Sequence, residues 1–545
     1  MTSATSGPAS RAGTLRRRLF GRASRPSAPS PERLIAVVVI LVAAYFVPRG
    51  VSWNADTHIF LTASMVDRGS ITLDPFAHFT GDIAFAHGHY YADKAPGLSL
   101  LMIPVYALLK YTLLGGHTYA SLFALPPAAR DDFLVRYLLT LVYAGIPTGI
   151  LCVLLYRFLG RFEISNFWRA LVALTYGLGT FARAFAGELF SHQLSALLVF
   201  GAFLLLYRIQ RGEVTQRAQI LVGLLLGTAI ITEYPTALIV LAIMLYALAG
   251  HHAWRKTLAR IAAGALPPLV IGALYNTLAF GGPLSLGYAH LDGPQSFRLG
   301  QAQGFFGITA PHLDALWQTT FGPYRGIFLL SPVLLLAIPG FVLLWRKPKW
   351  RRETLLWLAI VVIYGLFSVS YYAWNGGYSM GPRQFLPALP FLMVPVGAFI
   401  AHRQSRRWRA LVLILAACSI IVVELAAAVD PLVAPSYRSP LTQWVLPRLA
   451  GLTPDPSSPS LVPVALWHAL LTHAPLFVTA RLDNNWGMLF GLPGLLQLVP
   501  LLVLVAMFVL QYWQAVRHHA RVSATRTHAA TSALPAQQDI QARAR

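Results

Sequence analysis

The chain has 545 residues, of which 56% are hydrophobic and only 12% are charged. Apolar runs close to the length of a bilayer span recur from Leu34 to Trp513, which excludes a soluble globular domain and predicts an all-α, polytopic membrane protein. The arginines behind the net charge of +23 cluster between these runs. Arginines so placed are typical of cytoplasmic loops, so we expect membrane lipids, and no nucleic acid, as partners.

Both ends of the chain are basic. Residues 1–32 consist largely of Ser, Pro, Ala and Arg, a composition typical of a disordered cytoplasmic tail. The apolar run at 34–47 is short enough for a signal peptide, but the basic region before it is longer than such a peptide allows, so we favour an uncleaved first helix. We expect residues 33–514 to form one membrane-embedded domain and 515–545 to form a second basic cytoplasmic tail.

The positive-inside rule then fixes the predicted topology. With the N-terminus inside, every arginine cluster lies inside if the chain crosses the membrane about twelve times, which also leaves the C-terminus in the cytoplasm. The predicted spans are roughly 34–48, 133–156, 168–186, 190–207, 219–232, 235–249, 261–280, 327–345, 354–373, 384–401, 410–428 and 488–513. Long outer loops follow at 49–132, 281–326 and 429–487, and we expect the plasma membrane as the location.

Residues 98–114 do not fit this count. They are apolar enough to span, but a crossing there would invert every later loop and place the arginine clusters outside. Pro104 and Lys110 interrupt the run. We therefore predict an interfacial or re-entrant helix within the long first outer loop, with a spanning helix as the alternative.

The first outer loop opens with a polar, aromatic stretch from Trp53 to Leu98 that holds the first candidate site residues. Asp56 falls within about ten residues of the end of the first apolar run, near the membrane surface. Asp93 and Lys94 are adjacent in the sequence. Each has a structural alternative: Asp56 could cap a helix, and Asp93 with Lys94 could be a surface ion pair of little energetic value.

Other candidates lie in later outer segments. Glu188 and His192 have the i,i+4 spacing that can share a metal ion, although a plain polar contact or an exposed loop glutamate would explain them equally simply. Arg325 and Arg383 end two later loops. An arginine in either place can bind phosphate, or it can merely anchor the chain at the interface.

These residues resemble those of the GT-C membrane glycosyltransferases, and in particular the family 39 and aminoarabinose-transferase-like enzymes. The resemblance rests on Asp56 after the first span, on the motif Tyr91-Ala92-Asp93-Lys94-Ala95-Pro96, on Asp132 to Arg136 before the second span and on Glu188. Two positions depart from the family pattern. Ala95 stands where a second proline is usual, and Glu188 stands where an aspartate is commoner.

The resemblance implies a GT-C-like fold that transfers a sugar from a polyprenyl-phosphate donor to a glycan, lipid or protein acceptor on the outer face, by single displacement with inversion. Asp56 and Glu188 are then the catalytic candidates, because a carboxylate can accept the proton that the acceptor loses. Lys94, Arg383 and Arg325 are candidates for binding the donor phosphate.

Asp93, Tyr91 and His192 are supporting candidates in this interpretation. No cofactor is certain. A divalent metal is open, with Asp93, Glu188 and His192 as its ligands. The competing hypothesis is a twelve-span transporter or lipid flippase. Transporters concentrate polar residues in broken helices at mid-membrane, whereas here the ionisable groups fall at the outer ends of spans, which favours an interfacial enzyme.

Overall fold

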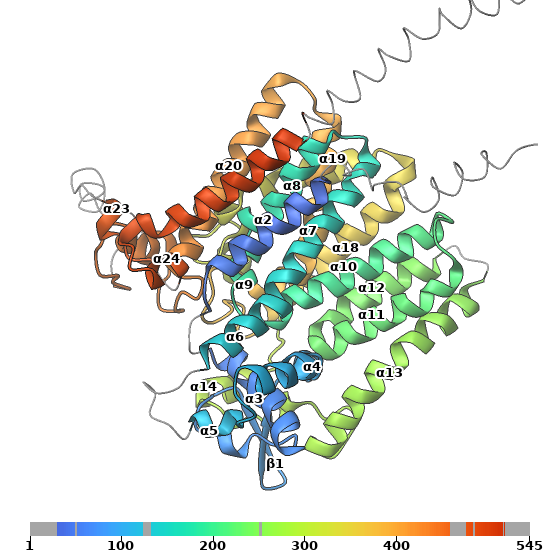
Figure 1. The fold of residues 1–545 in the computed structure, drawn as a ribbon. Coiled ribbons are helices and arrows are strands. Elements are labelled where there is room, and N and C mark those ends of the chain that lie inside the picture. The colour runs from blue at the N-terminus through green and yellow to red at the C-terminus, as the bar shows by residue number, and fades with distance from the viewer. Residues whose placement is uncertain are drawn as a thin grey trace, which may run out of the picture. The chain divides into compact units, whose positions relative to one another are not determined.

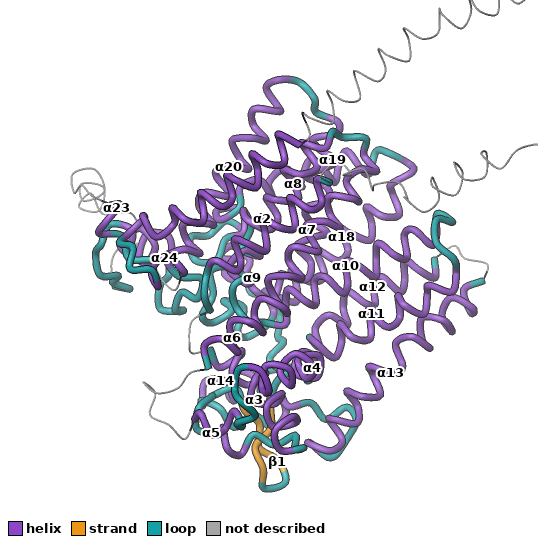
Figure 2. The backbone as a smooth tube through the Cα atoms, in the orientation of Figure 1, coloured by secondary structure: helices purple, strands orange, loops and turns teal. Residues whose placement is uncertain are grey.

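The computed structural model describes residues 30–48, 52–123, 132–249, 253–457, 476–482, 485–515 and 517. It is mostly helical, with 72% helix and 3% strand, as the purple tube of Figure 2 makes plain. The chain separates into two compact units, one of residues 1–34 and 504–545 and the other of residues 35–503. The basic tails expected from the sequence lie almost wholly outside the described residues, and the candidate site belongs to the second unit.

Among the described residues, seven helices are long and apolar enough to cross a membrane. They are Phe133–Phe162, Ser191–Gln210, Trp254–Phe280, Pro348–Ser370, Arg383–His402, Arg406–Val429 and Gly494–Ala515. The first contains α6 (Phe133–Thr140) and α7 (Ile146–Leu159), and the next five contain α10 (Ser191–Gln210), α13 (Trp254–Phe280), α18 (Arg351–Ser370), α19 (Leu389–His402) and α20 (Arg406–Val429). Their length and composition are those of a membrane-embedded protein.

The other five predicted spans also coincide with helices, but with shorter ones. These are α2 (Pro31–Tyr45), α8 (Asn166–Gly179), α11 (Gln219–Thr232), α12 (Ala237–Leu248) and α17 (Ala337–Trp345). α17 is short because a break precedes it, with α16 (Ile327–Leu330) and a 3₁₀ turn that begins at Pro332. The predicted division of the chain into helices is therefore confirmed, while twelve crossings of the membrane remain a prediction.

Small residues set the closest helix packing. α11 and α13 lie side by side (Figure 1) with their backbones in contact. A Cβ added to Gly223 would lie 1.9 Å from the carbonyl oxygen of Ile261, and one added to Gly264 would lie 1.8 Å from that of Ile220. Glycines at such positions let two helices approach closely enough for van der Waals contact along their backbones, which is the main attraction between helices in lipid.

The loops predicted to lie inside gather at one end of the second unit. α10 reaches this end near Arg208, whose side chain forms an ion pair with Glu213. Further contacts join the same group of loops, namely Arg161 with Glu213, Arg211 with Glu353, and Arg352 with the carbonyl oxygen of Ala249.

The loops predicted to lie outside meet at the other end of α10, near Ser191. Backbone hydrogen bonds join them: Phe85 to His290, Thr309 to Ser370, and Ser379 to Val433. In Figure 1, β1 (Ile83–Ala86), α3 (Trp53–Arg68), α4 (Gly97–Thr112), α5 (Tyr119–Phe123) and α14 (Gln295–Gln301) gather at this end. The predicted inner and outer segments are thus spatially separated, as the positive-inside assignment requires.

The expectation of helices alone misses one element, a two-stranded antiparallel hairpin in the first outer loop. β1 pairs with β2 (His89–Ala92) so that Ile83 faces Ala92 and Ala86 faces His89. The connecting residues His87 and Gly88 both have positive φ, 53° and 84°. Two such residues form the tight turn whose twist matches that of the strands, and glycine adopts it without strain.

α4 is the helix at the doubtful run 98–114. Its 16 residues extend about 24 Å, less than the hydrocarbon core of about 30 Å. It begins against α11, where a Cβ on Gly97 would come within 2.5 Å of the Ile231 carbonyl oxygen. Lys110 near its end forms an ion pair with Asp67 of α3, 3.1 Å away. Both ends of α4 therefore contact elements of the same end of the second unit, which supports an interfacial helix.

The topology can be tested by cysteine labelling at Ser121 and Ser165, which are both exposed, after serine replaces Cys418, the exposed native cysteine. An impermeant maleimide should label Ser121→Cys on intact cells and Ser165→Cys only after permeabilisation. The reverse pattern would mean that α4 crosses the membrane. Labelling of both residues from one side would remove the crossing at 133–156.

Candidate functional site

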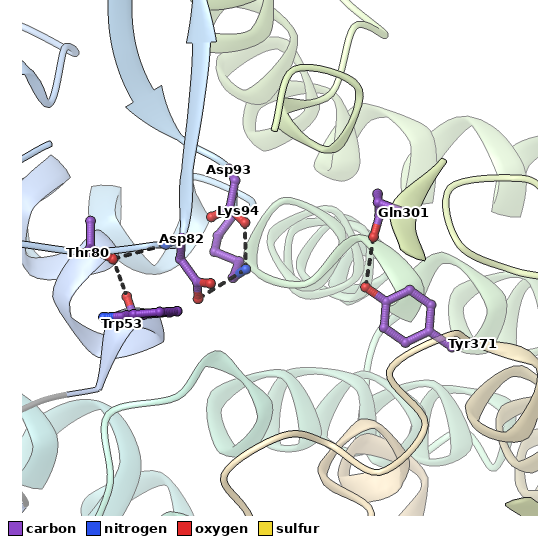
Figure 3. Close-up of polar contacts among 7 residues, drawn as sticks. All are labelled: Trp53, Thr80, Asp82, Asp93, Lys94, Gln301 and Tyr371. Carbon is purple, nitrogen blue, oxygen red and sulfur yellow. Dashed lines mark hydrogen bonds and ion pairs between the residues drawn. The ribbon is translucent and has the colours of Figure 1, made fainter. Parts of the chain in front are cut away.

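Lys94 lies at the centre of a polar cluster in the first outer loop. Its Nζ is 2.7 Å from Asp93 Oδ2 and 3.2 Å from Asp82 Oδ2 (Figure 3). The hairpin explains this arrangement. Asp82 precedes β1 and Asp93 follows β2, so the pairing of Ile83 with Ala92 brings the two aspartates to the same open end.

The cluster is buried and has one more negative charge than positive. Asp82, Asp93 and the Lys94 side chain are 7%, 2% and 20% exposed. Burial raises the pKa of Asp93, and Lys94 opposes that shift. Burial would lower the pKa of Lys94, but Asp82 and Asp93 outweigh it and raise this pKa. Lys94 is thus a firmly charged ammonium that already has two anionic partners, which is more than the isolated surface pair considered from the sequence.

Asp56 forms a second buried ion pair. It sits in the first turn of α3, whose N-cap position belongs to Ser52, so the alternative in which Asp56 caps this helix is wrong. Arg136 of α6 donates to Asp56 Oδ1 and also to Asp132, which in turn accepts a hydrogen bond from the Tyr119 hydroxyl at 2.6 Å. Burial raises the pKa of Asp56 to about 6, although Arg136 acts in the opposite direction.

A third buried pair joins α10 to the junction of α11 and α12. His192 Nδ1 lies 3.0 Å from Glu233 Oε2, and the Ser191 hydroxyl donates to the same oxygen. Burial alone would raise the pKa of Glu233, but His192 and Ser191 outweigh it and lower this pKa to about 2. His58 of α3 lies within electrostatic reach of both Lys94 and Glu233, and burial with the Lys94 charge lowers its pKa to about 4. This region therefore joins the Lys94 cluster electrostatically.

The remaining acidic and aromatic candidates, Glu188 and Tyr91, are both buried but have different surroundings. Glu188 is 1% exposed, in the segment between α9 (Ala182–Ala186) and α10. The glutamate that pairs with His192 is Glu233 and not Glu188, the residue that the i,i+4 spacing suggested. Tyr91 is 5% exposed and packs edge-on against Phe280, 5.6 Å between ring centroids, within the apolar core under the hairpin. Its place indicates support of the hairpin by packing.

The two candidate arginines have opposite surroundings. Arg325 is fully buried, and its guanidinium donates to the carbonyl oxygens of Asn375 and Gly377 at 3.0 Å. These contacts indicate that it holds the loop before Arg383 and do not favour direct phosphate binding. Arg383 is half-buried over the Phe190 ring, 5.1 Å from its centroid, and within the described residues its guanidinium has no hydrogen bond or ion pair. It is the candidate better placed to meet an anion.

A hydroxyl and an amide face the Lys94 cluster from other loops. Tyr371 donates to Gln301 Oε1 at 3.1 Å, and Figure 3 shows this pair across from Lys94 and Asp82. On the near side, the Thr80 hydroxyl donates to the carbonyl oxygen of Trp53 and accepts from the amide of Asp82. The loops at 281–326 and 371–383 thus contribute a hydrogen-bonded pair of side chains across from the polar cluster of the first outer loop.

The described residues contain no preformed site for the metal ion considered from the sequence. In the described ranges, no three His, Cys, Asp or Glu side chains gather closely enough to hold an ion. Of the three proposed ligands, Asp93 is engaged by Lys94 and His192 by Glu233.

Three contributors were missed in the sequence-based site, namely Asp82, Glu233 and the pair of Gln301 with Tyr371. Asp82 had a signal, because it lies eleven residues before Asp93, at the mirrored position across the two-residue turn of the hairpin. Glu233 also had one, because it is an acid between two apolar runs. The pairing of Gln301 with Tyr371 joins residues 70 positions apart and had none.

Comparison with known proteins does not assign a family. No family model matches the chain, and no curated protein is significantly similar to it.

The Lys94 cluster predicts a large effect of Lys94→Met on stability. The variant would leave two buried carboxylates unneutralised, which typically costs about 3–5 kcal/mol of unfolding free energy. Protonation removes that penalty, so the loss should shrink as the pH falls toward about 4. Thermal unfolding in detergent across this pH range measures it. A triple variant that adds Asp82→Asn and Asp93→Asn should recover most of the stability, and a fully stable Lys94→Met would contradict the expectation.

Proposed function

We propose that the protein is a GT-C-type membrane glycosyltransferase that moves a sugar from a polyprenyl-phosphate donor to an acceptor on the outer face of the plasma membrane. One observation carries the proposal. Carboxylates, a lysine, a histidine and an arginine that has no ion pair among the described residues gather from distant segments of the sequence at a single end of an apolar helical unit. A donor with a lipid tail and a polar head needs a polar site and an apolar surface next to each other.

The resemblance of the Tyr91 to Pro96 motif to GT-C enzymes agrees with this chemistry. The proposed topology has twelve spans, residues 98–114 interfacial, and both termini in the cytoplasm. The separation of arginine-rich loops from the site loops along α10 supports it.

Arg383 is the proposed ligand of the donor phosphate. A guanidinium binds phosphate oxygens through two parallel hydrogen bonds, and a vacant one avoids the cost of breaking an existing ion pair. Lys94 contributes differently from the expectation based on sequence. Because Asp82 and Asp93 already hold it, its proposed role is to keep these acids ionised and in place next to the donor, and Arg325 supports the loop that carries Arg383.

Asp56 is the proposed catalytic base. An acceptor hydroxyl attacks the anomeric carbon of the donor, the bond from that carbon to the phosphate oxygen breaks, and Asp56 takes the proton of the hydroxyl. The leaving phosphate keeps the electron pair, and the configuration inverts. A carboxylate whose pKa is about 6 is ionised at neutral pH and is still basic enough to accept a proton as the new bond forms. Glu188 remains the second candidate.

The transporter or flippase hypothesis explains less of the arrangement. A transport site lies near mid-membrane, where broken helices meet. Here the ion pairs of Asp56 and Lys94 fall within or beside the first outer loop, and Glu233 lies at a helix junction of the same end. One further charged pair lies within the predicted spans, where Nε of Arg183 in α9 donates to both oxygens of Glu424 at 3.0 Å, while Nη2 of this arginine has no hydrogen-bond partner among the described residues.

The base assignment can be separated from a structural role of the ion pair. Asp56→Asn should lower turnover about 10²–10⁴-fold with donor affinity little changed. Asp132→Asn is the matched control, because it removes the other carboxylate of Arg136 and leaves Asp56 intact. Wild-type turnover should also fall as the pH drops below about 6, where Asp56 binds a proton. Similar losses in both variants would assign Asp56 a structural role and leave Glu188 as the base to test.

The phosphate assignment predicts a binding defect. Arg383→Gln should weaken binding of polyprenyl phosphate at least about tenfold, because a charge-assisted hydrogen bond contributes roughly 1.5–3 kcal/mol. Arg403→Gln is the control, because it removes an arginine that also lies over an aromatic ring, that of Trp408, but in a predicted inner loop. Equal affinities of the two variants would exclude Arg383 from the phosphate site.

A further inference from the structure

A pocket of about 480 Å³ opens in the 281–326 loop. Its lining includes Tyr288, Leu291, Arg298, Gln301, Phe305 and Phe306. Pockets of this size suit small ligands, and a mostly apolar lining with a few polar groups is the usual composition of such sites. None of these residues is among the groups assigned above to proton transfer or to the donor phosphate.

The lining combines aromatic rings with a buried amide. Phe305 is 72% exposed, and its ring meets that of Phe306 edge-on, 4.9 Å between centroids. Gln301 is only 6% exposed. A sugar ring presents apolar C–H faces, which pack on aromatic rings, and hydroxyl groups, which need hydrogen-bonding partners. This pairing of surfaces fits a saccharide better than a purely apolar ligand.

The pocket loop is held in a costly conformation. Phe306 has φ of 50°, between Gly304 at 54° and Gly307 at 78°. A bulky residue rarely adopts this region and persists in it only when its surroundings enforce it, as at binding sites. Two contacts do so here. Gln301 Nε2 donates to the Phe306 carbonyl oxygen at 2.8 Å, and Gly307 packs against Tyr372 so tightly that a Cβ would lie 2.5 Å from the ring.

Arg298 adds an unneutralised charge to the wall. It lies in α14 and is exposed, and in the part of the chain that the structure describes its guanidinium has no hydrogen bond, ion pair or ring contact. An arginine at the wall of an aromatic pocket is suited to a carboxylate or phosphate on the ligand, which it can bind through two parallel hydrogen bonds.

The pocket adjoins the Lys94 cluster. Gly287, next to the lining residue Tyr288, lies against the backbone of Asp93, where a Cβ would come within 2.8 Å of its carbonyl oxygen. On the other wall, Gln301 accepts the hydrogen bond of Tyr371, and Figure 3 shows this pair across from Lys94. A ligand in the pocket would therefore lie beside the groups proposed to act on the donor.

We propose that this pocket binds the acceptor, and that the acceptor is a saccharide with an anionic substituent, either a carboxylate or a phosphate, that meets Arg298. Phe305 and Phe306 pack on the sugar ring and Gln301 positions it. The assignment as acceptor rests on the proposed glycosyl transfer, whereas the binding of an anionic saccharide does not.

Binding to the purified full-length protein in detergent tests the inference, with methyl glucoside, methyl glucuronide and glucose 6-phosphate as probes in saturation-transfer NMR titrations. The wild-type protein should prefer one or both anionic probes at least about tenfold over methyl glucoside. Arg298→Gln should abolish that preference, and Phe305→Ala should weaken all three probes. Both residues are exposed, so folding should survive, which thermal unfolding checks. Arg403→Gln should match the wild type.

Equal binding of neutral and anionic probes, no binding of any probe, or a preference unchanged in Arg298→Gln would overturn the inference. Phe305→Ala with unchanged affinity would assign that ring to the lipid interface and contradict the pocket as a saccharide site. The proposed function fails separately. Specific binding of anionic saccharides without transfer from any polyprenyl-phosphate sugar would refute the transferase and retain the saccharide site. Transfer that Arg298→Gln leaves intact would retain the transferase and refute the pocket as its acceptor site.

Discussion

The neutralisation of two buried aspartates by Lys94 is the interaction on which the outer end of the protein depends. Asp82 and Asp93 emerge from opposite strands of one hairpin, and without a cation between them their repulsion would open it. The closed hairpin presents Ala84 and Phe85 to the 281–326 loop, which bonds to the hairpin and to the segment after α18. A single cation thus helps to position three loops, and with them the pocket in the 281–326 loop.

Recurring apolar runs of about the length of a membrane span determine most of the fold, and for that reason the sequence predicted it well. Each of the twelve predicted spans contains a helix, because a helix is how a long apolar segment satisfies its own backbone. The hairpin escaped prediction because its eight paired residues are few and of mixed polarity, with His87 and Gly88 as its only strong turn signal. The apolar run at 98–114 has the composition of a span. The positive-inside rule predicted an interfacial helix there, and the contacts of this helix with Asp67 and α11 support that prediction.

The site was predictable where its members are neighbours in the chain, and not where folding brings them together. Asp93 and Lys94 stand side by side in the sequence, whereas Arg136 reaches Asp56 across 80 residues. Arg325 and Arg383 look alike in sequence, as loop arginines next to glycine or proline. The difference between them lies in the backbone carbonyl groups that surround Arg325 and the aromatic face under Arg383, and no local pattern encodes such surroundings.

Three buried carboxylates lie at this end of the protein, and their ion-pair partners distinguish their roles, because burial raises the pKa of both Asp56 and Asp93 to about 6 whereas the pKa of Glu233 is lowered. Glu233, with His192 and Ser191 against one oxygen, has a pKa of about 2 and stays ionised, so it is a poor proton acceptor. Asp93 is tied to Lys94, and accepting a proton would break the neutralisation that closes the hairpin. Asp56 has the same raised pKa as Asp93 but a different partner, because Arg136 also binds Asp132 and so keeps one carboxylate partner when Asp56 accepts a proton. A group so poised can exchange a proton near neutral pH without loss of the fold, which is what a general base requires.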